Sequence, residues 1–497
     1  MKKKDLPTAL YRAAQVRELD RLAIQEQGIP GYTLMSRAGA AVFDALRQRW
    51  PQAKRIAVVC GAGNNGGDGY VVATLARQAG MDVQALTLSD PSGLQGDALT
   101  AFRDAEAAAV PIRPFEAGAL AEAEVIVDAI LGTGLEREVT GAWREAIKAI
   151  NAQPAGIIAI DIPSGLNADT GAVMGVAVHA HLTVTFIGLK QGLFTGQGST
   201  CCGAVLFDDL NVPPDIYTAI HPACRRYTGE DLPELLPRRT RSAHKGAYGH
   251  VLVVGGDHGM GGAARMAAEA AARCGAGLVS IATRASHAAL HAAARPELMF
   301  HGVESAVELA PLLARATVVA IGPGLGRSEW GQSLLEFVLD SDLPMVADAD
   351  ALNLLAVNPA FRNNWVLTPH AGEAARLLKM TQVQIEADRF TAVEDLALRF
   401  GGVAVLKGAG TLLAGKDGTL AVCCVGNPGM ASGGMGDVLT GIIAGLLAQG
   451  LSPVQAAQAG VAIHGRAGDL AAEHGERGLL ATELMLFIRK LVNHLSP

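Results

Sequence analysis

Short apolar runs alternate with helical patterns through the first half of the chain. An apolar run over 55–60 is followed by a glycine-rich segment and then by a stretch over 70–78 with apolar residues at helical spacing. Further buried strands are predicted over 83–88, 125–130, 156–160 and 183–187. Buried strands that alternate with helices indicate a parallel sheet covered on both faces, with polar loops at the carboxyl ends of its strands.

A second series of the same kind begins near residue 250. Strands are predicted over 250–254, 278–283, 317–321, 345–347, 365–367 and 403–406, and an alanine-rich helix over 263–274. Between the two series, the segment 211–245 breaks the pattern with a cluster of prolines and a short basic run. We interpret this segment as the connection between two α/β domains, and its basic run as a solvated surface.

The composition supports two domains and excludes several classes of protein. A chain of 497 residues exceeds what one hydrophobic core usually supports. The formal net charge is -7, so no basic surplus exists to neutralise nucleic-acid phosphates. No apolar segment typical of a signal peptide follows the basic start, and no apolar run is long enough to span a bilayer. We expect a cytoplasmic protein that binds neither nucleic acid nor a membrane, and we also expect a homo-oligomer.

The segment 61–69 (GAGNNGGDG) combines glycines with oxygen-bearing side chains. It contains the spacing G-x-G-x-x-G after a strand and before a helix, which is typical of dinucleotide-binding loops. The side chains of Asn64, Asn65 and Asp68 instead favour a cation or the polar head of a ligand, because a pyrophosphate loop relies on backbone amides. The alternative is a tight turn in which these residues only cap the following helix.

Two carboxylates and a hydroxyl follow other predicted strands of the first half. Asp128 ends one of these strands, and Asp161 and Ser164 follow the next (DIPSG). The carboxyl ends of parallel strands meet at one edge, so Asn65, Asp128 and Ser164 can converge as oxygen ligands of a monovalent cation. Asp161 would then be free for proton transfer. The alternative is that each aspartate only caps a helix.

The second half ends in a glycine-rich segment with one carboxylate. The segment 427–437 (NPGMASGGMGD) runs directly into an apolar helical pattern over 438–447. Glycine amides and a helix start favour an anion, and Asp437 stands where a base can remove the proton of a hydroxyl that is being phosphorylated. His370 and Glu373 are candidates to contact substrate and a hydrated Mg²⁺, the alternative for His370 being a structural role.

Taken together, these motifs resemble the bifunctional NAD(P)H-hydrate repair enzymes, which join an NAD(P)H-hydrate epimerase to an ADP-dependent dehydratase of the ribokinase-like superfamily. The resemblance covers essentially the whole chain. It rests on segments 63–69 (GNNGGDG), 161–165 (DIPSG), 244–246 (HKG), 322–326 (GPGLG), 368–370 (TPH), 407–411 (KGAGT) and 433–437 (GGMGD). It implies a Rossmann-like three-layer α/β/α epimerase domain over 1–226 and a ribokinase-like α/β/α dehydratase domain over 227–497.

The resemblance also implies which residues act in each half. The implied hydrate-binding residues of the epimerase are Asn64, Asn65, Gly66, Gly67, Asp68, Gly132, Thr133, Gly134, Leu135, Glu136, Arg137 and Glu138. Asp161 is the implied acid or base that contacts substrate, and the implied ligands of a potassium ion are Asn65, Asp128 and Ser164. The implied hydrate contacts of the dehydratase are Ala263, Gly324, His370 and Asp437. Its implied ADP contacts are Lys407, Gly408, Ala409, Gly410, Thr411 and Gly436, with Mg²⁺ accompanying the nucleotide.

The implied reaction repairs NADH or NADPH that has taken up water on its nicotinamide ring. The dehydratase transfers a phosphoryl group from ADP to the new hydroxyl, and phosphate then leaves as the ring double bond returns. It accepts only the S epimer, which the epimerase supplies from the R epimer. Family members use ADP in bacterial-type chains and ATP in others, and the spacing here decides neither. Three rivals stay open: a conventional small-molecule kinase in the second half, a non-catalytic binding module in the first half, and an NAD-dependent oxidoreductase.

Overall fold

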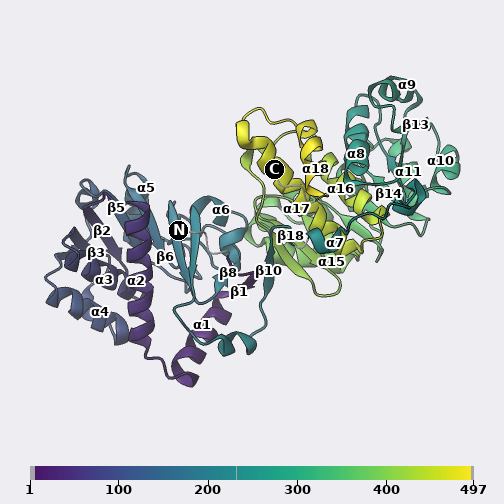
Figure 1. Cartoon of the computed structure of the whole chain (residues 1–497). Helices are drawn as coiled ribbons and strands as arrows, with labels where there is room; N and C mark the ends of the chain where they lie inside the picture. The colour runs from purple at the N-terminus through teal and green to yellow at the C-terminus, as the bar shows by residue number, and fades with distance from the viewer. Residues whose placement is uncertain (1–5, 231, 494–497) are drawn as a thin grey trace. The chain divides into compact units, whose positions relative to one another are not determined.

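The chain divides into two compact units between Arg225 and Arg226, each with its own hydrophobic core (Figure 1). The structure, a computed structural model, describes residues 6–230 and 232–493. Both units have α/β architecture, as the alternation of apolar runs and helical patterns predicts.

The sheet of the first unit is parallel throughout and has the strand order β4-β3-β2-β5-β6-β7-β9. Its strands are β2 (Arg55–Cys60), β3 (Asp82–Thr87), β4 (Ile112–Pro114), β5 (Val125–Ala129), β6 (Gly156–Ile160), β7 (Leu182–Phe186) and β9 (Ala204–Asp208). The chain leaves β2 toward β3 and β4 on one side and returns to β5 on the other. This reversal opens a crevice at the carboxyl ends of β2 and β5, where a ligand is expected.

Successive residues of β2 face opposite cores of the first unit. Ile56 and Val58 pack with the helices of one face, whereas Ala57 and Val59 pack with those of the other. The first face is covered by α2 (Gly31–Arg49), α3 (Asn64–Gln78) and α4 (Gly96–Ala107), and the second by α5 (Gly141–Asn151). The result is a three-layer sandwich.

A short ribbon accompanies this sandwich and fixes the first helix. Strand β1 (Ala9–Tyr11) pairs in parallel with β8 (Leu189–Lys190) and antiparallel with the start of β10 (Cys224–Tyr227). Helix α1 (Ala13–Arg21) follows β1 at once and buries Val16 and Leu19 in the core beneath α2. The sequence patterns did not predict this ribbon, because its strands have only two to four residues.

The segment 61–69 differs from its predicted form, since α3 already begins at Asn64 instead of following a loop. Gly66 and Gly69 have no positive φ, so backbone freedom is not what requires them. A Cβ on Gly69 would lie 2.5 Å from the Cβ of Ala129. The glycines therefore allow α3 to pack closely on β5, which brings the start of α3 to the edge of the sheet.

The sheet of the second unit has the order β13-β12-β11-β14-β15-β16-β17-β18-β19 and is parallel as far as β17. Its strands are β11 (His250–Val254), β12 (Leu278–Thr283), β13 (Met299–Gly302), β14 (Val318–Ile321), β15 (Met345–Ala347), β16 (Trp365–Leu367), β17 (Val403–Leu406), β18 (Thr411–Gly415) and β19 (Leu420–Cys423). The reversal point falls between β11 and β14. The carboxyl edge of this sheet is thus the expected ligand side.

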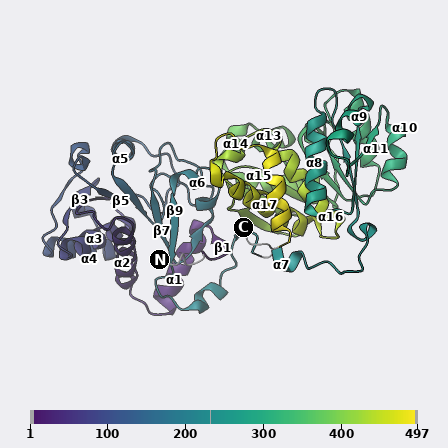
Figure 2. The same ribbon diagram turned by 45° about the horizontal axis from the view of Figure 1, so that its top comes forward.

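Helices cover both faces of the second sheet (Figures 1 and 2). One core joins the sheet to α8 (Gly261–Cys274), α16 (Met435–Ala448), α17 (Pro453–Ala471) and α18 (Leu484–Leu491). The remaining longer helices are α9 (Ala285–Ala294), α10 (Ala306–Leu313), α11 (Glu329–Leu339), α12 (Ala349–Val357), α13 (Ala371–Leu378), α14 (Gln382–Ala387) and α15 (Arg389–Phe400). The buried residues of α11 to α15 lie outside that core, on the opposite face.

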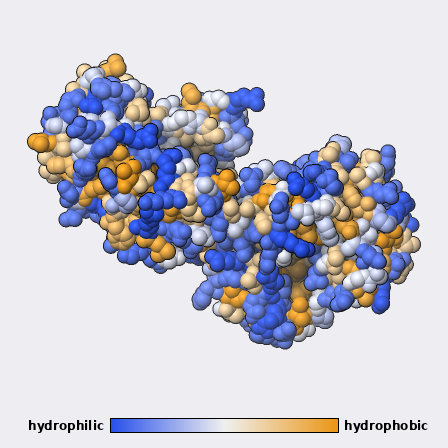
Figure 3. All heavy atoms as spheres, turned by 180° about the vertical axis from the view of Figure 1, so that it is seen from behind, coloured by the Kyte–Doolittle hydropathy of each residue, from blue (hydrophilic) through white to orange (hydrophobic). Residues whose placement is uncertain are grey.

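Hydrophilic and apolar side chains are interspersed on the face drawn in Figure 3. The large apolar side chains that are exposed, such as Val307, Val383 and Leu398, come from different helices. Within 6–230 and 232–493, none of the helices has the length and apolar character that a membrane crossing requires.

The close approach of α3 to the sheet yields a stability prediction. We expect Gly69→Ala to lower the free energy of unfolding by about 1–3 kcal/mol, because the added methyl collides with buried Ala129 and Cys60. Gly63→Ala is the matched control, since a Cβ there meets no atom within 4 Å and its φ is -104°. Thermal unfolding of the two variants measures the difference, and equal midpoints would contradict the packing role of Gly69.

Candidate active sites

A cavity of about 590 Å³ lies at the carboxyl edge of the first sheet. It gathers most of the residues that the resemblance implies for hydrate binding, namely Asn64, Asn65, Asp68, Gly132, Thr133, Gly134, Leu135, Glu136, Arg137 and Asp161. Gly66, Gly67 and Glu138 do not line it. An additional wall comes from the first helical segment of the chain, which contributes Val16, Arg17, Asp20 and Ile24. The size is typical of a small-molecule site.

Asp161 faces this cavity from the end of β6 with one oxygen already engaged. Its Oδ1 accepts hydrogen bonds from the Lys190 ammonium, from the Thr185 hydroxyl at 3.2 Å and from the backbone N–H of Phe186 at 3.3 Å. In the described part of the chain Oδ2 has no such partner. The residue holds a left-handed backbone conformation (φ +66°), which costs a non-glycine residue about 1–3 kcal/mol. This strain fixes the direction in which the carboxylate points.

Lys190 is the partner of Asp161 that the sequence patterns did not single out. Its side chain is 1% exposed, and its Nζ also donates to the Thr185 hydroxyl at 3.0 Å and to the Phe186 carbonyl at 3.2 Å. A buried ammonium with three acceptors is a fixed positive charge at the floor of the cavity. The available signal was a single charged residue, Lys190, in the segment 182–194.

Two of the other carboxyl groups that line the same cavity, those of Asp20 and Asp68, bind protons more tightly than usual. Burial raises the pKa of Asp20 to about 6, although Lys190 opposes the shift. Burial raises the pKa of Asp68 well above its ordinary value, and Asp161 and Asp20 add to the shift. A cavity with several carboxyl groups in unlike surroundings can both give and take a proton near neutral pH.

The residues predicted to hold a cation meet beside the end of β5. Asp128 is fully buried, and its Oδ1 and Oδ2 accept hydrogen bonds from the Ser164 hydroxyl at 2.5 Å and the Ser164 N–H at 2.8 Å. The Ser164 oxygen also accepts from the N–H of Leu131 at 2.8 Å. Burial raises the pKa of Asp128 to about 6, against the effect of the Ser164 hydrogen bonds.

Asn65 reaches the same segment from the start of α3. Its side chain lies about 3.5 Å from where a Cβ on Gly132 would be, one residue beyond Leu131. Its Nδ2 is buried and has no hydrogen-bond partner. Exchange of the amide oxygen and nitrogen, which have nearly the same shape, would present an oxygen here and complete an oxygen-lined site. The residues described contain no group of three or more His, Cys, Asp or Glu arranged for a metal.

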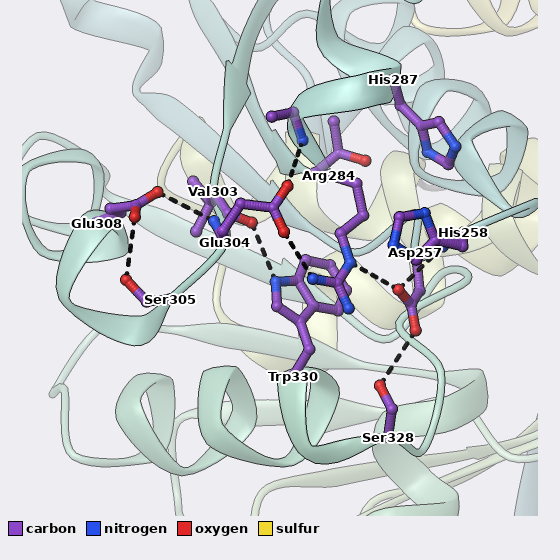
Figure 4. Close-up of polar contacts among 12 residues, drawn as sticks. Asp257, His258, Arg284, His287, Val303, Glu304, Ser305, Glu308, Ser328 and Trp330 are labelled. Atoms are coloured by element: carbon purple, nitrogen blue, oxygen red, sulfur yellow. Dashed lines mark hydrogen bonds and ion pairs between the residues drawn. The ribbon is translucent and has the colours of Figure 1, made fainter.

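Arg284 ties together four loops at the carboxyl edge of the second sheet (Figure 4). Its Nε donates to Asp257 Oδ1 at 2.8 Å and its Nη1 to Glu304 Oε2 at 2.7 Å. Its guanidinium also stacks over the Trp330 ring at 4.3 Å, and the Ser328 hydroxyl donates to Asp257 Oδ2 at 3.2 Å. These residues follow β11, β12, β13 and β14, so the cluster holds the loops around the reversal point in one arrangement.

This cluster brings Ala263 and Gly324 together. The Asp257 N–H donates to the Gly324 carbonyl at 2.6 Å. Gly324 has a φ of +59°, and a Cβ there would lie 2.7 Å from the Met260 carbonyl oxygen and 3.2 Å from the Ala263 Cβ. Two residues predicted to contact the hydrate are therefore neighbours, although 61 positions separate them in the sequence (324 − 263).

A buried ion pair occupies the centre of the same edge. Lys407 Nζ lies 2.7 Å from Asp348 Oδ1 and 3.9 Å from Glu373 Oε2, and the Thr440 hydroxyl donates to Asp348 Oδ2 at 2.8 Å. Burial by itself would raise the pKa of Asp348, but Lys407 and Thr440 outweigh it and the pKa is lowered. Burial opposes the charge of Lys407 as well, yet Asp348 and Glu373 raise its pKa. Both groups therefore stay charged at neutral pH.

His370 uses its backbone N–H and its Nδ1 in structural hydrogen bonds, and its Nε2 lies 3.5 Å from Glu373 Oε1. As the N-cap of α13, its Nδ1 accepts the N–H of Gly372 at 3.0 Å, while Glu373 Oε2 accepts the His370 N–H at 2.9 Å. Burial lowers the pKa of His370, and Lys407 adds to the effect. The neutral ring then carries its proton on Nε2, which can donate to a ligand. Burial raises the pKa of Glu373 to about 7, although Lys407 opposes it.

Asp437 stands in the first turn of α16, which begins at Met435, as expected of a carboxylate at a helix start. Gly434, at φ +91°, turns the chain into the helix, and a Cβ on Gly436 would lie only 3.2 Å from Lys407 Nζ. Burial raises the pKa of Asp437 to about 7, and Asp348 adds to the shift while Lys407 opposes it. The N–H groups of a first helical turn have no partner within the helix. A base and anion-binding amides thus lie side by side.

The segment 407–411 forms the turn between β17 and β18. Gly408 and Gly410 have φ values of +145° and +64°, which side chains rarely adopt. The Arg389 guanidinium donates to the carbonyl of Lys407 at 3.1 Å and supports the turn from below. The predicted nucleotide-binding segment is therefore a rigid turn that starts at the buried ion pair.

A separate hollow of about 720 Å³ lies at the opposite edge of this sheet. Its lining includes Gly402 and Val403 at the start of β17, and Lys416 and Asp417 beyond β18. It contains none of the residues predicted to act. The chemistry is concentrated at the carboxyl edge instead.

Comparisons with known proteins agree with this division into two sites. Residues 31–192 match a family model described as the YjeF-related protein N-terminus, and residues 251–490 match one described as NAD(P)H-hydrate dehydratase. The bifunctional NAD(P)H-hydrate repair enzyme of Coxiella burnetii is 53% identical over 487 residues, which cover 98% of this chain and 100% of the relative. The enzyme of the same name from Escherichia coli is 46% identical over 490 residues, with coverage of 98% and 95%.

A solved structure resembles the second unit. It is a ribokinase-like superfamily protein from Enterococcus faecalis, 30% identical, with a TM-score of 0.52 and coverage of 55% of this chain and 98% of that chain. The predicted ribokinase-like fold of the second unit is confirmed. The two family models and the identity along almost the whole length establish that this chain belongs to the family of bifunctional NAD(P)H-hydrate repair enzymes.

Proposed function

We propose that the two units share the repair of hydrated NAD(P)H. The first unit (residues 1–226) epimerises the hydrate at the carboxyl edge of its sheet, and the second (227–497) dehydrates it at the carboxyl edge of its own. The observation that carries this proposal is that each of the two units of this chain, a member of the family, has a carboxylate at the carboxyl edge of its sheet. Asp161 serves the first unit and Asp437 the second. None of the three rival functions requires both of these carboxylates.

In the second unit, Asp437 removes the proton of the hydroxyl on the hydrated ring while that oxygen attacks the terminal phosphoryl group of the nucleotide. The amides over Gly433 to Gly436 and the Lys407 ammonium stabilise the charge on the phosphoryl group in transfer. Phosphate then leaves far more readily than hydroxide. Ala263, Gly324 and His370 position the ring, with the Nε2 proton of His370 as a donor.

In the first unit, the cavity residues of 64–68 and 132–137 bind the hydrate, and Asp161 exchanges a proton with it. Because Lys190 donates a hydrogen bond to Oδ1 of Asp161, Oδ2 is the oxygen that exchanges the proton. The predicted binding roles of Gly66, Gly67 and Glu138 stay predictions, because these residues do not line the cavity.

The oxygen-bearing residues beside β5 fit a potassium ion. Asp128 supplies one carboxylate and Ser164 a hydroxyl, while the buried Nδ2 of Asn65 has no hydrogen-bond partner. A monovalent cation there would supply positive charge that fixes the segment 130–132 under the hydrate. Asn65 would then hold the ion on one side and the binding loop on the other.

The remaining partners follow from the proposed reaction. We propose ADP as the phosphoryl donor, accompanied by Mg²⁺ and bound by Lys407, Gly408, Ala409, Gly410, Thr411 and Gly436. A phosphoryl-transfer site needs such a cation to neutralise the phosphates, and Glu373 is the nearest carboxylate to the Lys407 pair. A cytoplasmic homo-oligomer remains our expectation for the assembled protein.

Removal of either carboxylate tests the division of labour. From a mixture of both NADH-hydrate epimers and ADP, we expect the unaltered protein to restore all of the dihydronicotinamide absorbance. Asp437→Ala should restore none, because the base for phosphorylation is lost, and Asp161→Ala should restore at once only the directly usable epimer. The absorbance change at completion measures each. Accumulation of a phosphorylated product that keeps its phosphate would instead identify a small-molecule kinase.

The burial of Asp437 predicts how dehydration depends on pH. Its pKa is raised to about 7, and only the ionised carboxylate can accept a proton. The rate constant should therefore rise about tenfold per pH unit below 7 and level off above it, because one ionisation controls it. The measurement is kcat/KM for the usable epimer between about pH 5.5 and 8.5. A rate that is flat over this range would exclude Asp437 as the base.

Because Nδ2 of Asn65 has no hydrogen-bond partner, a variant at this residue can test potassium binding without a large effect on folding stability. We expect Asn65→Ala to leave the thermal midpoint without potassium nearly unchanged, because Nδ2 has no hydrogen bond to lose. Potassium should raise the midpoint of the unaltered protein, by mass action, but not that of the variant. Titration with KCl against NaCl gives the comparison. An equal upward shift in both proteins would place the ion elsewhere.

A further inference from the structure

Asp20 belongs to the epimerase cavity although it lies before the region that the family model matches. That region starts at residue 31, whereas Asp20 stands in the last turn of α1. Its carboxyl group nevertheless lines the same cavity as Asp161 and Lys190. Nothing in the motif pattern of the sequence pointed to this residue.

The position of Asp20 is set by its helix and not by its own polar contacts. Val16 and Leu19 of the same helix are buried in the core, and the N–H of Ala13 donates to Asp169 Oδ1 at 2.6 Å. No hydrogen bond or ion pair to the Asp20 carboxyl is present among residues 6–230 and 232–493. The half-buried group therefore faces the cavity without a protein partner.

A carboxyl group in such a position lowers the stability of the fold, so its presence calls for a functional reason. A desolvated carboxyl without hydrogen bonds destabilises a fold, since water would solvate it better. The charged and titratable groups around it are Lys190 on β8, Asp161 after β6, Asp68 on α3 and Tyr217, with Arg17 on its own helix. Lys190 already serves Asp161, so it offers Asp20 attraction at a distance but no hydrogen bond.

We propose that Asp20 is the second proton-transfer residue of the epimerase site and works with Asp161 on the hydroxyl-bearing carbon of the hydrate. The proposal rests on the epimerase function proposed above. Inversion of a carbon requires proton transfer on two sides of the ring. The two carboxyls come from different walls, since Asp161 follows a strand of the sheet and Asp20 belongs to the helix that closes the cavity.

The step balances with these two groups alone. Water adds to the enamine double bond of the ring with its hydroxyl on the carbon next to nitrogen, where nitrogen stabilises positive charge. One carboxylic acid protonates this hydroxyl; the C–O bond breaks with its electron pair going to oxygen, and the nitrogen lone pair forms a C=N bond. Water then adds to the opposite face, the C=N pair returns to nitrogen, and the other carboxylate takes the proton. The two carboxyls have exchanged one proton, which prepares the reverse reaction.

The test compares three variants of the full-length protein: Asp20→Asn, Asp20→Glu and the control Glu18→Gln. Glu18 lies on the same helix but is exposed and paired with Arg21 at 2.7 Å. The readout is the rate at which the pure R hydrate of NADH becomes the S hydrate, after subtraction of the rate without protein. Dehydration of the S hydrate by the second unit of each variant serves as an internal control.

We expect Asp20→Asn to slow epimerisation by at least about 100-fold, which is the usual effect of removing a general acid or base. Asp20→Glu should recover part of the rate, and Glu18→Gln should match the unaltered protein. The thermal midpoint of Asp20→Asn should be equal or higher, because a desolvated charge is removed. The ionisation near pH 6 should vanish from its rate profile, since burial gives Asp20 a pKa of about 6.

Each other outcome contradicts the proposal. Epimerisation by Asp20→Asn at the normal rate would show that Asp20 transfers no proton. A slower rate with a lower thermal midpoint and an unchanged pH profile would make Asp20 a structural residue. If the unaltered protein fails to interconvert the epimers, the epimerase function itself falls, which the rate without protein makes evident.

Discussion

In each unit a lysine at the carboxyl edge of the parallel sheet forms an ion pair with a carboxylate that follows another strand. Lys190 holds Asp161 in the first unit, and Lys407 holds Asp348 in the second. A charge that is largely removed from water is tolerated only when its partners are fixed. Burial raises the pKa values of the neighbouring carboxyl groups, and the lysine of each pair opposes that shift.

The protonation of the carboxyl groups around the lysine differs between the two units. Around Lys407, the carboxylate of Asp348 is ionised, and burial leaves Asp437 and Glu373 with pKa values of about 7. That arrangement suits a single base beside an anion-binding helix start. Around Lys190, one carboxylate is engaged while Asp20 and Asp68 hold their protons more tightly, which suits proton transfer in both directions. The same physical device thus supports two different reactions.

The sequence predicted the parallel strands well, but it did not predict which side chains pair at the two sites. Runs such as 156–160, 250–254 and 345–347 are the observed strands residue for residue, because apolar runs ending in polar loops are a local signal. The helix start at Asn64 was missed, since glycines that permit close packing look like glycines of a loop. Lys190 was missed because only the folded chain brings it to Asp161, 29 positions earlier.

The central claim is that each unit holds a complete site on its own sheet. The most direct measurement mixes two variants that each lack one of the two activities, Asp161→Ala and Asp437→Ala protein, with both NADH-hydrate epimers and ADP. If each unit is complete, the mixture restores all of the dihydronicotinamide absorbance at the rate of epimerisation, because the first unit of one variant supplies the second unit of the other. Recovery no faster and no greater than with Asp161→Ala alone would contradict the claim, since it would mean that the two sites act only within one chain.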